Sequence, residues 1–377
     1  MSKVKLSKSC IGADEKQAVM SVLDRGFLGM GKEVQLFEQD LKAFIGTDKE
    51  VICVNTGTAA LHLALLCLDL RPGDEVLVPT LTYVASFQAI SATGAIPIAC
   101  DVLESNGFID VKDAERRITP RTRVIMPVHY ASNTSGMNDV FALAEKYDLR
   151  VVEDAAHSFG GTRDNVKIGG KGDVICFSFD GIKNITSGEG GAVVTSDDKL
   201  AGRIKDARLL GVSKDTEMRF LGQRSWDFDV PNQGFRYHMS DIMAAIGRVQ
   251  LRRFEDLAAQ RCSLAKNYAA AFKKMIGISF INLDYTNTVP HIFPVFFKSS
   301  DIRDSVKVCL QEAGIETGIH YKPNHTLSFY KDHCSSYPKA EKLYSVMLTL
   351  PLHPSLSLKQ IDLVINTIET FLLGVRK

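Results

Sequence analysis

Residues 177–195 read FSFDGIKNITSGEGGAVVT, and this stretch decides the fold. Two runs of strand-forming residues, 174–179 and 192–195, flank a glycine-dense turn at residues 187–191. Lys183 is the one lysine between the two predicted strands. Such a lysine is a candidate nucleophile, because a desolvated ammonium loses its proton readily and the free amine can form a Schiff base. A loop lysine that faces solvent is the ordinary alternative, and this stretch alone leaves both interpretations open.

Alternating strands and helices extend outward from this stretch. Predicted strands lie at residues 51–54, 75–78, 95–100, 123–126 and 150–153, with helices at 58–70, 84–92 and 137–147. Short apolar strands joined by helices predict a mostly parallel sheet that is buried on both faces, in an α/β fold. Two helices, at residues 14–24 and 33–44, precede this pattern.

The chain after residue 195 changes character. A helix at 200–210 leads into a polar, irregular stretch that reaches residue 236. One or two long helices at about 240–274 and further helices at 303–312, 338–348 and 358–372 then alternate with strands at 278–280, 291–297 and 317–320. We therefore predict a large α/β domain over residues 1–245 and a smaller α+β domain over residues 246–377.

The composition is that of a soluble globular protein. The 377 residues carry a formal net charge of +1, so we expect no nucleic-acid partner and no membrane surface. No apolar run approaches the roughly 20 residues of a membrane span, and the first residues lack the apolar core of a signal peptide. The eight cysteines form no CxxC pair, which favours reduced thiols in a cytoplasmic protein.

Two further segments place chemistry at strand ends. Residues 55–60, NTGTAA, join a strand to a helix, where the amides of Gly57 and Thr58 would bind phosphate. An ordinary helix cap is the alternative there. Asp154 ends a buried strand, and it either pairs with a protonated ring nitrogen or caps the next helix. A phosphate cradle, an acid and a Schiff-base lysine are together the contacts that pyridoxal phosphate requires, and Ser178 adds a hydroxyl for the phosphate.

The chain resembles the DegT/DnrJ/EryC1/StrS family of sugar aminotransferases. The resemblance is carried, in order along nearly the whole chain, by the motifs NTGTAALHLAL, PTLTYVASFQAI, VVEDAAHSFGG, FSFDGIKNITSGEGGAVV, FRYHMSDIMAAIG and GIETGIHYKPNH. It implies the fold-type I aminotransferase architecture and pyridoxal phosphate as cofactor. It also implies amination of a nucleotide-linked keto sugar, with glutamate as the usual donor, by a two-fold symmetric homodimer.

The resemblance also implies a role for each matching residue. Lys183 is the Schiff-base lysine, Asp154 pairs with the ring nitrogen of the cofactor, and His157 lies beside the ring. The residues that hold the cofactor's phosphate are Gly57, Thr58 and Ser178, and Tyr83 stacks on its ring. His320 and Tyr321 match the segment that meets the sugar nucleotide.

One position departs from the family pattern. Many members read GYNYRM where this chain reads GFRYHM, so Arg236 stands where an asparagine reaches the neighbouring subunit's cofactor phosphate. An arginine there would bind either that phosphate or the diphosphate of the substrate. The sequence leaves both roles open.

The turn after Lys183 bears on the substrate. Family members with an ITxxEGG run, as at residues 185–191, mostly aminate carbon 4 of the hexose. We therefore expect a nucleotide-linked 4-keto-6-deoxyhexose as acceptor and a 4-amino-4,6-dideoxyhexose as product, with amination at carbon 3 of a 3-keto sugar as the alternative. The resemblance places this chemistry in the synthesis of bacterial surface polysaccharides such as the O-antigen of lipopolysaccharide.

Other classes fit the sequence less well. A nicotinamide oxidoreductase would need a GxGxxG after the first strand, which is absent. A binding protein that keeps the fold without transamination would not need Lys183. The chain has no HExxH motif and no close pair of ligands among His129, His157, His320, His325 and His333, so we predict no metal site.

Overall fold

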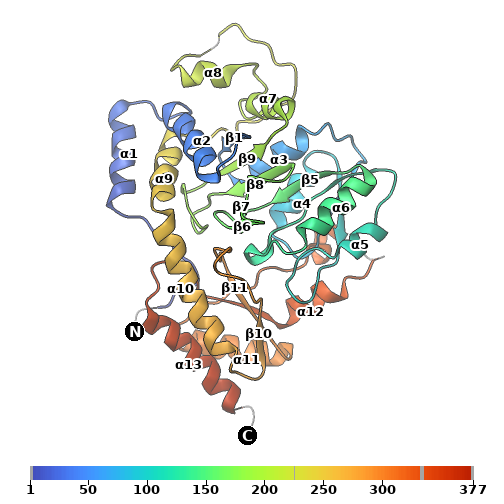
Figure 1. Ribbon diagram of the computed structural model, residues 1–377, viewed down its shortest axis with the longest axis vertical. Helices are drawn as coiled ribbons and strands as arrows, with labels where there is room; N and C mark the ends of the chain where they lie inside the picture. Colours follow the sequence, from blue (N-terminus) through green and yellow to red (C-terminus); the bar gives the residue numbers. More distant parts are fainter. Residues whose placement is uncertain (1–2, 225, 332–334, 375–377) are drawn as a thin grey trace.

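The computed structural model describes residues 3–224, 226–331 and 335–374, and a seven-stranded sheet forms its centre (Figure 1). The strands lie in the order β1-β9-β8-β5-β4-β2-β3. Their bounds are β1 (Glu50–Val54), β2 (Glu75–Pro79), β3 (Ile96–Cys100), β4 (Thr122–Ile125), β5 (Arg150–Asp154), β8 (Val174–Ser178) and β9 (Gly191–Thr195). Only the two pairings made by β9 are antiparallel, so the predicted mostly parallel sheet is confirmed.

Both faces of this sheet are buried, as the continuous apolar strands predict. On β8, Ile175 and Phe177 join a core cluster with Phe37, whereas Val174 and Cys176 join the cluster on the opposite face. The alternation follows from the two-residue period of a strand. The helices that cover the sheet are α2 (Lys32–Ile45), α3 (Gly57–Leu66), α4 (Val84–Ser91), α5 (Val111–Arg116), α6 (Met137–Tyr147) and α7 (Asp198–Ala207).

A second layer of helices leads from the sheet to the C-terminal part (Figure 1). Helix α1 (Ala13–Arg25) and α2 both pack against α9 (Asp241–Arg252), and α10 (Phe254–Phe272) continues downward in the figure. The predicted boundary near residue 245 falls inside α9. The division into two domains stays a prediction.

The C-terminal part has its own sheet and core. Three antiparallel strands, β10 (Ile278–Phe280), β11 (Phe293–Phe297) and β12 (Met347–Leu350), pack with α10, α11 (Ser300–Glu312), α12 (Pro338–Val346) and α13 (Leu358–Gly374). Val4 from the other end of the chain also enters this core and pairs with Ile315. Within the described residues, no helix combines the length and apolar composition needed to cross a membrane.

Several predicted elements were wrong in type or length. The helix predicted at 58–70 ends at Leu66, before Asp69 takes a left-handed φ of 59°. Residues 347–348, predicted as helix, belong to β12, because a short apolar run fits either element until its partner β11 is known. The strand predicted at 317–320 is reduced to one bridge between Gly318 and Thr349.

Short elements escaped the sequence pattern altogether. The stretch before residue 236, predicted as irregular, contains helix α8 (Asp215–Phe220), which is too short to show a hydrophobic period. An ion pair of 2.6 Å between Arg219 and Asp215 spans its one turn and stabilises it. The remaining small elements are α5, β6 (Thr162–Arg163), β7 (Val166–Lys167), η1 (Tyr130–Ser132), η2 (Asn324–Thr326) and η3 (Ser328–Tyr330).

Candidate active site

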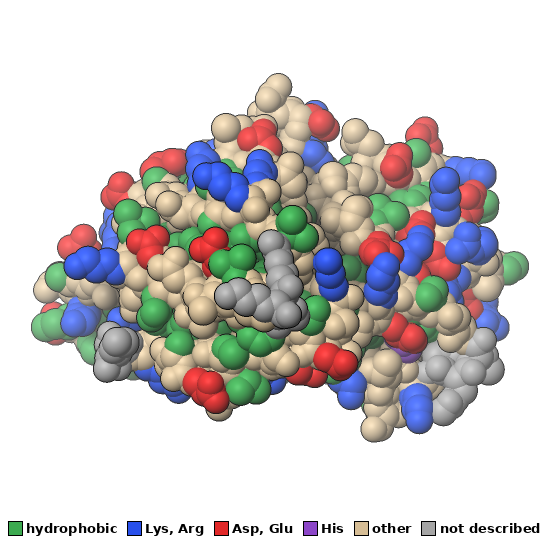
Figure 2. Space-filling model, turned by 90° about the horizontal axis from the view of Figure 1, so that it is seen from below, with side chains coloured by type: hydrophobic (Ala, Val, Ile, Leu, Met, Phe, Trp, Pro, Cys, Tyr) green, Lys and Arg blue, Asp and Glu red, His purple; other side chains and the backbone are tan. Residues whose placement is uncertain are grey.

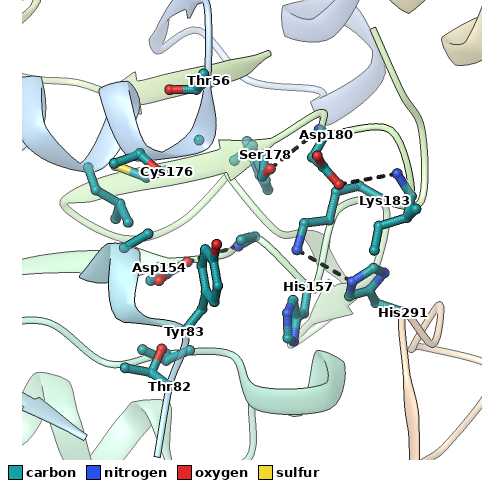
Figure 3. A pocket seen from close by; sticks show the side chains of 18 of the residues that line it. Thr56, Thr82, Tyr83, Asp154, His157, Cys176, Ser178, Asp180, Lys183 and His291 are labelled. Atoms are coloured by element: carbon teal, nitrogen blue, oxygen red, sulfur yellow. Dashed lines mark hydrogen bonds between the residues drawn. The ribbon is translucent and has the colours of Figure 1, made fainter. Parts of the chain in front are cut away.

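A cavity of about 440 Å³ opens at the carboxyl ends of β5 and β8 (Figure 3). This is the edge where parallel α/β sheets place their ligands. The predicted site residues that line it are Gly57, Thr58, Tyr83, Asp154, His157, Ser178, Lys183, His320 and Tyr321. The fold therefore brings together nine side chains or backbone groups that lie up to 264 positions apart in the sequence, from 57 to 321.

The Lys183 amine faces the interior of this cavity (Figure 3). Its Nζ lies 3.4 Å from Nε2 of His291, and the turn that carries it is closed by a 3.1 Å bond from its amide to the Asp180 carbonyl. Burial lowers the pKa of Lys183 to about 8, against the opposing attraction of Asp154 and Asp180. With this pKa about a tenth of the amine is unprotonated at pH 7, far more than for an ordinary lysine, and the free amine is the state that a nucleophile needs. The alternative of a solvent-facing loop lysine is wrong.

The carboxylate of Asp154 lies on another wall of the cavity. It is buried at the end of β5, where Oδ2 accepts a 2.8 Å hydrogen bond from Ser86 and Oδ1 accepts one of 3.2 Å from the Ala156 amide. Within the described residues, Asp154 forms no ion pair with lysine or arginine within 4 Å. Its negative charge is therefore free to pair with a cationic group in the cavity.

The start of α3 forms a third wall. The first-turn amides of Gly57 and Thr58 have no intrahelical acceptor, and they meet the positive end of the helix dipole. Gly57 is required by its close approach to β8, because a Cβ there would lie 2.7 Å from the Cβ of Ser178. Thr56 is the helix cap and accepts a 2.9 Å bond from Ala59, so the predicted cap and the free amides occur together. The amides of Gly57 and Thr58, the positive end of the α3 dipole and the Ser178 hydroxyl together form a site that suits an anion.

His157 is held between the sheet and the C-terminal part. Its Nδ1 accepts a 3.3 Å bond from the Ala131 amide, and its Nε2 lies 2.9 Å from the Tyr321 hydroxyl. Burial lowers the pKa of His157 well below its ordinary value, and the charge of Lys183 adds to this effect. The ring is therefore neutral at pH 7 and acts as a hydrogen-bonding wall of the cavity.

His320, Tyr321 and Tyr83 form the side of the cavity toward the C-terminal part. His320 Nδ1 lies 2.9 Å from the Thr349 hydroxyl, and burial lowers the pKa of His320 to about 4. The rings of Tyr83 and Tyr321 have centroids 5.6 Å apart. Tyr83 is 58% exposed, so its ring is available to stack on a ligand.

Arg236 is the one predicted site residue that does not line the cavity. It is exposed, and its carbonyl accepts a 3.5 Å bond from the Asn55 amide side chain. Through Asn55, Arg236 lies near the anion site at the start of α3, but it does not line the cavity of its own chain. Whether Arg236 acts on a second chain stays a prediction.

Three functional candidates were missed at the sequence level. Ser86 holds Asp154, His291 contacts Lys183, and the buried Arg261 donates hydrogen bonds of 3.0 and 3.2 Å to the carbonyls of Ile182 and Lys183. None lies in a short motif that encodes its contact, because each meets its partner only through tertiary packing. Ser86 is the one of the three that lies inside a stretch quoted for the family resemblance, PTLTYVASFQAI, although that stretch does not indicate its contact with Asp154.

Metal ligands do not gather in this site. Among the residues that the structure describes, no group of three or more His, Cys, Asp or Glu side chains is placed to hold a metal ion. Of the five histidines considered from the sequence, His333 lies outside the described residues.

Comparisons with known proteins agree with this geometry. The chain is 35% identical over 373 residues to the spore coat polysaccharide biosynthesis protein SpsC of Bacillus subtilis, covering 97% of this chain and 96% of SpsC. The putative sugar aminotransferase Spr1654 from Streptococcus pneumoniae, in its PMP form, superposes with a TM-score of 0.92 at 29% identity, covering 99% of this chain and 98% of that one. Its PLP form gives 0.91.

A third similar protein is PseC of Helicobacter pylori, an aminotransferase involved in the biosynthesis of pseudoaminic acid. It superposes with a TM-score of 0.91 at 26% identity, over 99% of this chain and all of PseC. The model of the DegT/DnrJ/EryC1/StrS aminotransferase family matches residues 9–369. The chain belongs to this family, and the predicted family, fold class and enzyme class are confirmed.

Proposed function

We propose that this sugar aminotransferase moves an amino group from glutamate to carbon 4 of a nucleotide-linked 4-keto-6-deoxyhexose, giving a 4-amino-4,6-dideoxyhexose. The observation that carries the proposal is the meeting of three groups in one cavity: the Lys183 amine, the Asp154 carboxylate and the anion site at Gly57 and Ser178. In the overall exchange, one water supplies the oxo oxygen of the 2-oxo acid formed from glutamate, and the ketone oxygen of the sugar leaves as another water, so no net water is formed.

Pyridoxal phosphate, the predicted cofactor, is confirmed by the PLP and PMP forms of Spr1654. The cavity walls fit it, because the anion site matches a phosphate, the free charge of Asp154 matches a protonated ring nitrogen, and Lys183 supplies an amine. When bound, the cofactor supplies an electron-accepting ring that carries the amino group between the two substrates.

Each of the residues that line the cavity has a separate role in the proposed reaction. Lys183 is the covalent attachment point, and its amine takes a proton from the reacting carbon of one substrate and returns one to the other. Asp154 holds a proton at the ring nitrogen, and Ser86 and the Ala156 amide hold Asp154 in place. His157 and Tyr83 confine the ring from its sides, while His320 and Tyr321 face the sugar nucleotide.

The choice of carbon 4 is supported by the turn at residues 184–191. Glu189 from this turn lines the cavity beside Lys183, and Gly190 and Gly191 carry no side chain. The turn therefore shapes the floor on which the sugar ring rests. A misplacement of about 1 Å costs on the order of 100-fold in rate, so this floor selects which ketone reacts. Amination at carbon 3 of a 3-keto sugar is the alternative.

The assembly and setting complete the proposal. We expect a two-fold symmetric homodimer in the cytoplasm, in which Arg236 serves the partner's site and binds either the cofactor phosphate or the substrate diphosphate. The setting that we propose is the synthesis of bacterial surface polysaccharide, as in the O-antigen of lipopolysaccharide. The relative SpsC, a spore coat polysaccharide biosynthesis protein, supports this setting.

Two measurements test the proposal. The purified protein should absorb visible light after reconstitution with pyridoxal phosphate, and borohydride should bleach this band and fix the cofactor to Lys183. Initial rates with matched 3-keto and 4-keto sugars on the same nucleotide, with glutamate as donor, should then favour the 4-keto compound. A clear preference for the 3-keto compound would overturn the choice of carbon, and a colourless protein would overturn the reaction class.

A further inference from the structure

His291 contacts the Lys183 amine from the C-terminal part of the chain. It precedes β11, is only 4% exposed, and places Nε2 3.4 Å from Nζ of Lys183 (Figure 3). Its backbone is fixed on both sides, because its amide donates a 3.1 Å bond to the Ser132 hydroxyl and its carbonyl accepts a 3.2 Å bond from Arg261. These bonds fix the backbone of His291, and its ring packs against the ring of His157, with centroids 4.5 Å apart.

The protonation states of the two groups constrain each other. A Lys183 ammonium has only donors, so Nε2 must accept and the proton of the neutral ring must sit on Nδ1. Nδ1 of His291 is buried and has no hydrogen-bond partner among the described residues. A buried donor without an acceptor is costly, so another group is needed on that side.

A separate small cavity beside His291 has room for one small group. It is also lined by His291, with Ser7, His320 and Thr349 as its other polar side chains, and its volume is about 20 Å³. This is enough for one water molecule, which needs two to four polar partners. Ser7 belongs to the N-terminal segment, so the start of the chain helps to close the cavity.

We propose that His291 is a positioning residue for Lys183: Nε2 accepts a hydrogen bond from the amine, and one water in the small cavity accepts the proton of Nδ1. The inference rests on the proposed function, in which Lys183 is the reacting amine. Its effect is to fix the direction of the amine without adding a charge. A carboxylate at this place would instead hold the amine protonated.

The charges around the ring fit a neutral acceptor. Burial lowers the pKa of His291 well below its ordinary value, and Lys183, His157, Arg261 and His320 add to the effect. Around the amine, Asp154 and Asp180 favour the ammonium, whereas burial and Arg261 disfavour it. The hydrogen bond to Nε2 is therefore one of the few contacts that stabilise the ammonium inside the site.

Two substitutions separate the two ends of the ring. His291→Gln keeps a polar atom near the place of Nε2, whereas His291→Asn keeps one near Nδ1 and loses the contact with Lys183. In the apoprotein, brief acetylation over a range of pH, read by peptide mass, gives the pKa of Lys183, with the exposed Lys146 as an internal reference. We expect the Asn variant to lower the pKa of Lys183 by about one unit and the Gln variant to leave it close to the native value.

The outcomes distinguish this inference from the proposed function. If native Lys183 titrates like Lys146, the assignment of Lys183 as the reacting amine fails. If native Lys183 titrates low and the protein binds pyridoxal phosphate, but both variants match the native pKa, only the role of His291 is overturned. Thermal unfolding of each variant checks that it is folded. A crystal structure that resolves ordered waters should show one water bound to Nδ1 of His291. A small cavity without water would overturn the proposed water, but not the contact of Nε2 with Lys183.

Discussion

Two regions of the molecule differ in how their side chains are packed. One is the inner wall of the cavity, which carries Lys183 and Asp154, and the other is the outer segment at residues 210–236. On the inner wall, Asp154 accepts a hydrogen bond from Ser86, and the Lys183 amine contacts His291. In the outer segment, apolar side chains lie open: Leu221 is 72% exposed, Trp226 84% and Phe228 53%. α8 in this segment lies away from the sheet, at the top of Figure 1.

This difference indicates which parts of the site a single chain provides and which need a second chain. The groups that match the cofactor are packed and hydrogen-bonded within the chain, so they are in place before any ligand arrives. An exposed apolar stretch followed by an exposed arginine is typical of a surface that another protein covers. Figure 2, which views the molecule from below, shows a different face, where charged and apolar side chains are interspersed. The predictions below test this contrast, from the largest effect to the smallest.

Removing the Lys183 amine should cause the largest loss of turnover. Lys183→Ala should lower turnover by roughly 1,000-fold or more, because both the attachment point and the proton-transfer group are lost. Steady-state rates measure this loss, and Lys146→Ala, at an exposed lysine that pairs with Glu115, is the matched control. Turnover within tenfold of the native rate would contradict the role of Lys183.

Weakening the acid should cost less than removing the amine. Asp154→Asn should lower turnover by on the order of 100-fold, because an amide cannot hold a proton at the ring nitrogen. Ser86→Ala removes one hydrogen bond to the carboxylate and should cost about tenfold. Both variants should still react with borohydride at Lys183. A larger loss for Ser86→Ala than for Asp154→Asn would show that the carboxylate is not the acting group.

The outer segment should behave as shared between two chains. Equal amounts of Lys183→Ala and Arg236→Ala chains, unfolded and refolded together, should recover roughly a quarter of the native rate, because half of the random dimers hold one intact site. Lys183→Ala mixed with Asp154→Asn is the control and should show no more than the residual rate of the Asp154→Asn chains, since both residues belong to the same chain's cavity. Recovery in neither mixture, or an active monomer by light scattering, would overturn the shared site.

The smallest effect concerns the stability of the fold in acid, through the buried His353. Burial lowers the pKa of His353 to about 4, with Arg261 and Lys8 adding positive charge nearby. Between pH 6.5 and 4 the unfolded chain therefore binds a proton that the folded chain does not, so stability falls as pH falls through this window. The loss from this group should be about 2 kcal/mol between pH 7 and pH 5.

Urea unfolding at pH 7 and pH 5 measures this loss. His353→Gln should be less sensitive to the change of pH than the native protein, although it is less stable at pH 7. An equal fall in stability for both proteins would assign the acid sensitivity to the other buried histidines, such as His320.

The sequence predicted the elements whose signal is local. Helix Met137–Tyr147 was predicted to the residue, because its apolar positions recur at helical spacing over three turns. Strand β8 was predicted to within one residue for a similar reason. Helix α8 and strand β12 escaped, since one is too short for a period and the other is defined by pairing with β11.

The residue types at the strand ends were likewise determined by the sequence alone. Lys183, Asp154 and Gly57 follow buried strands, and parallel strands bring such ends to one edge of a sheet. Tertiary structure decided what each group then does. The pKa of Lys183 depends on burial, and its neighbour His291 lies 108 positions away. Burial and long-range contacts arise only when the C-terminal part closes on the sheet, so no local pattern records them.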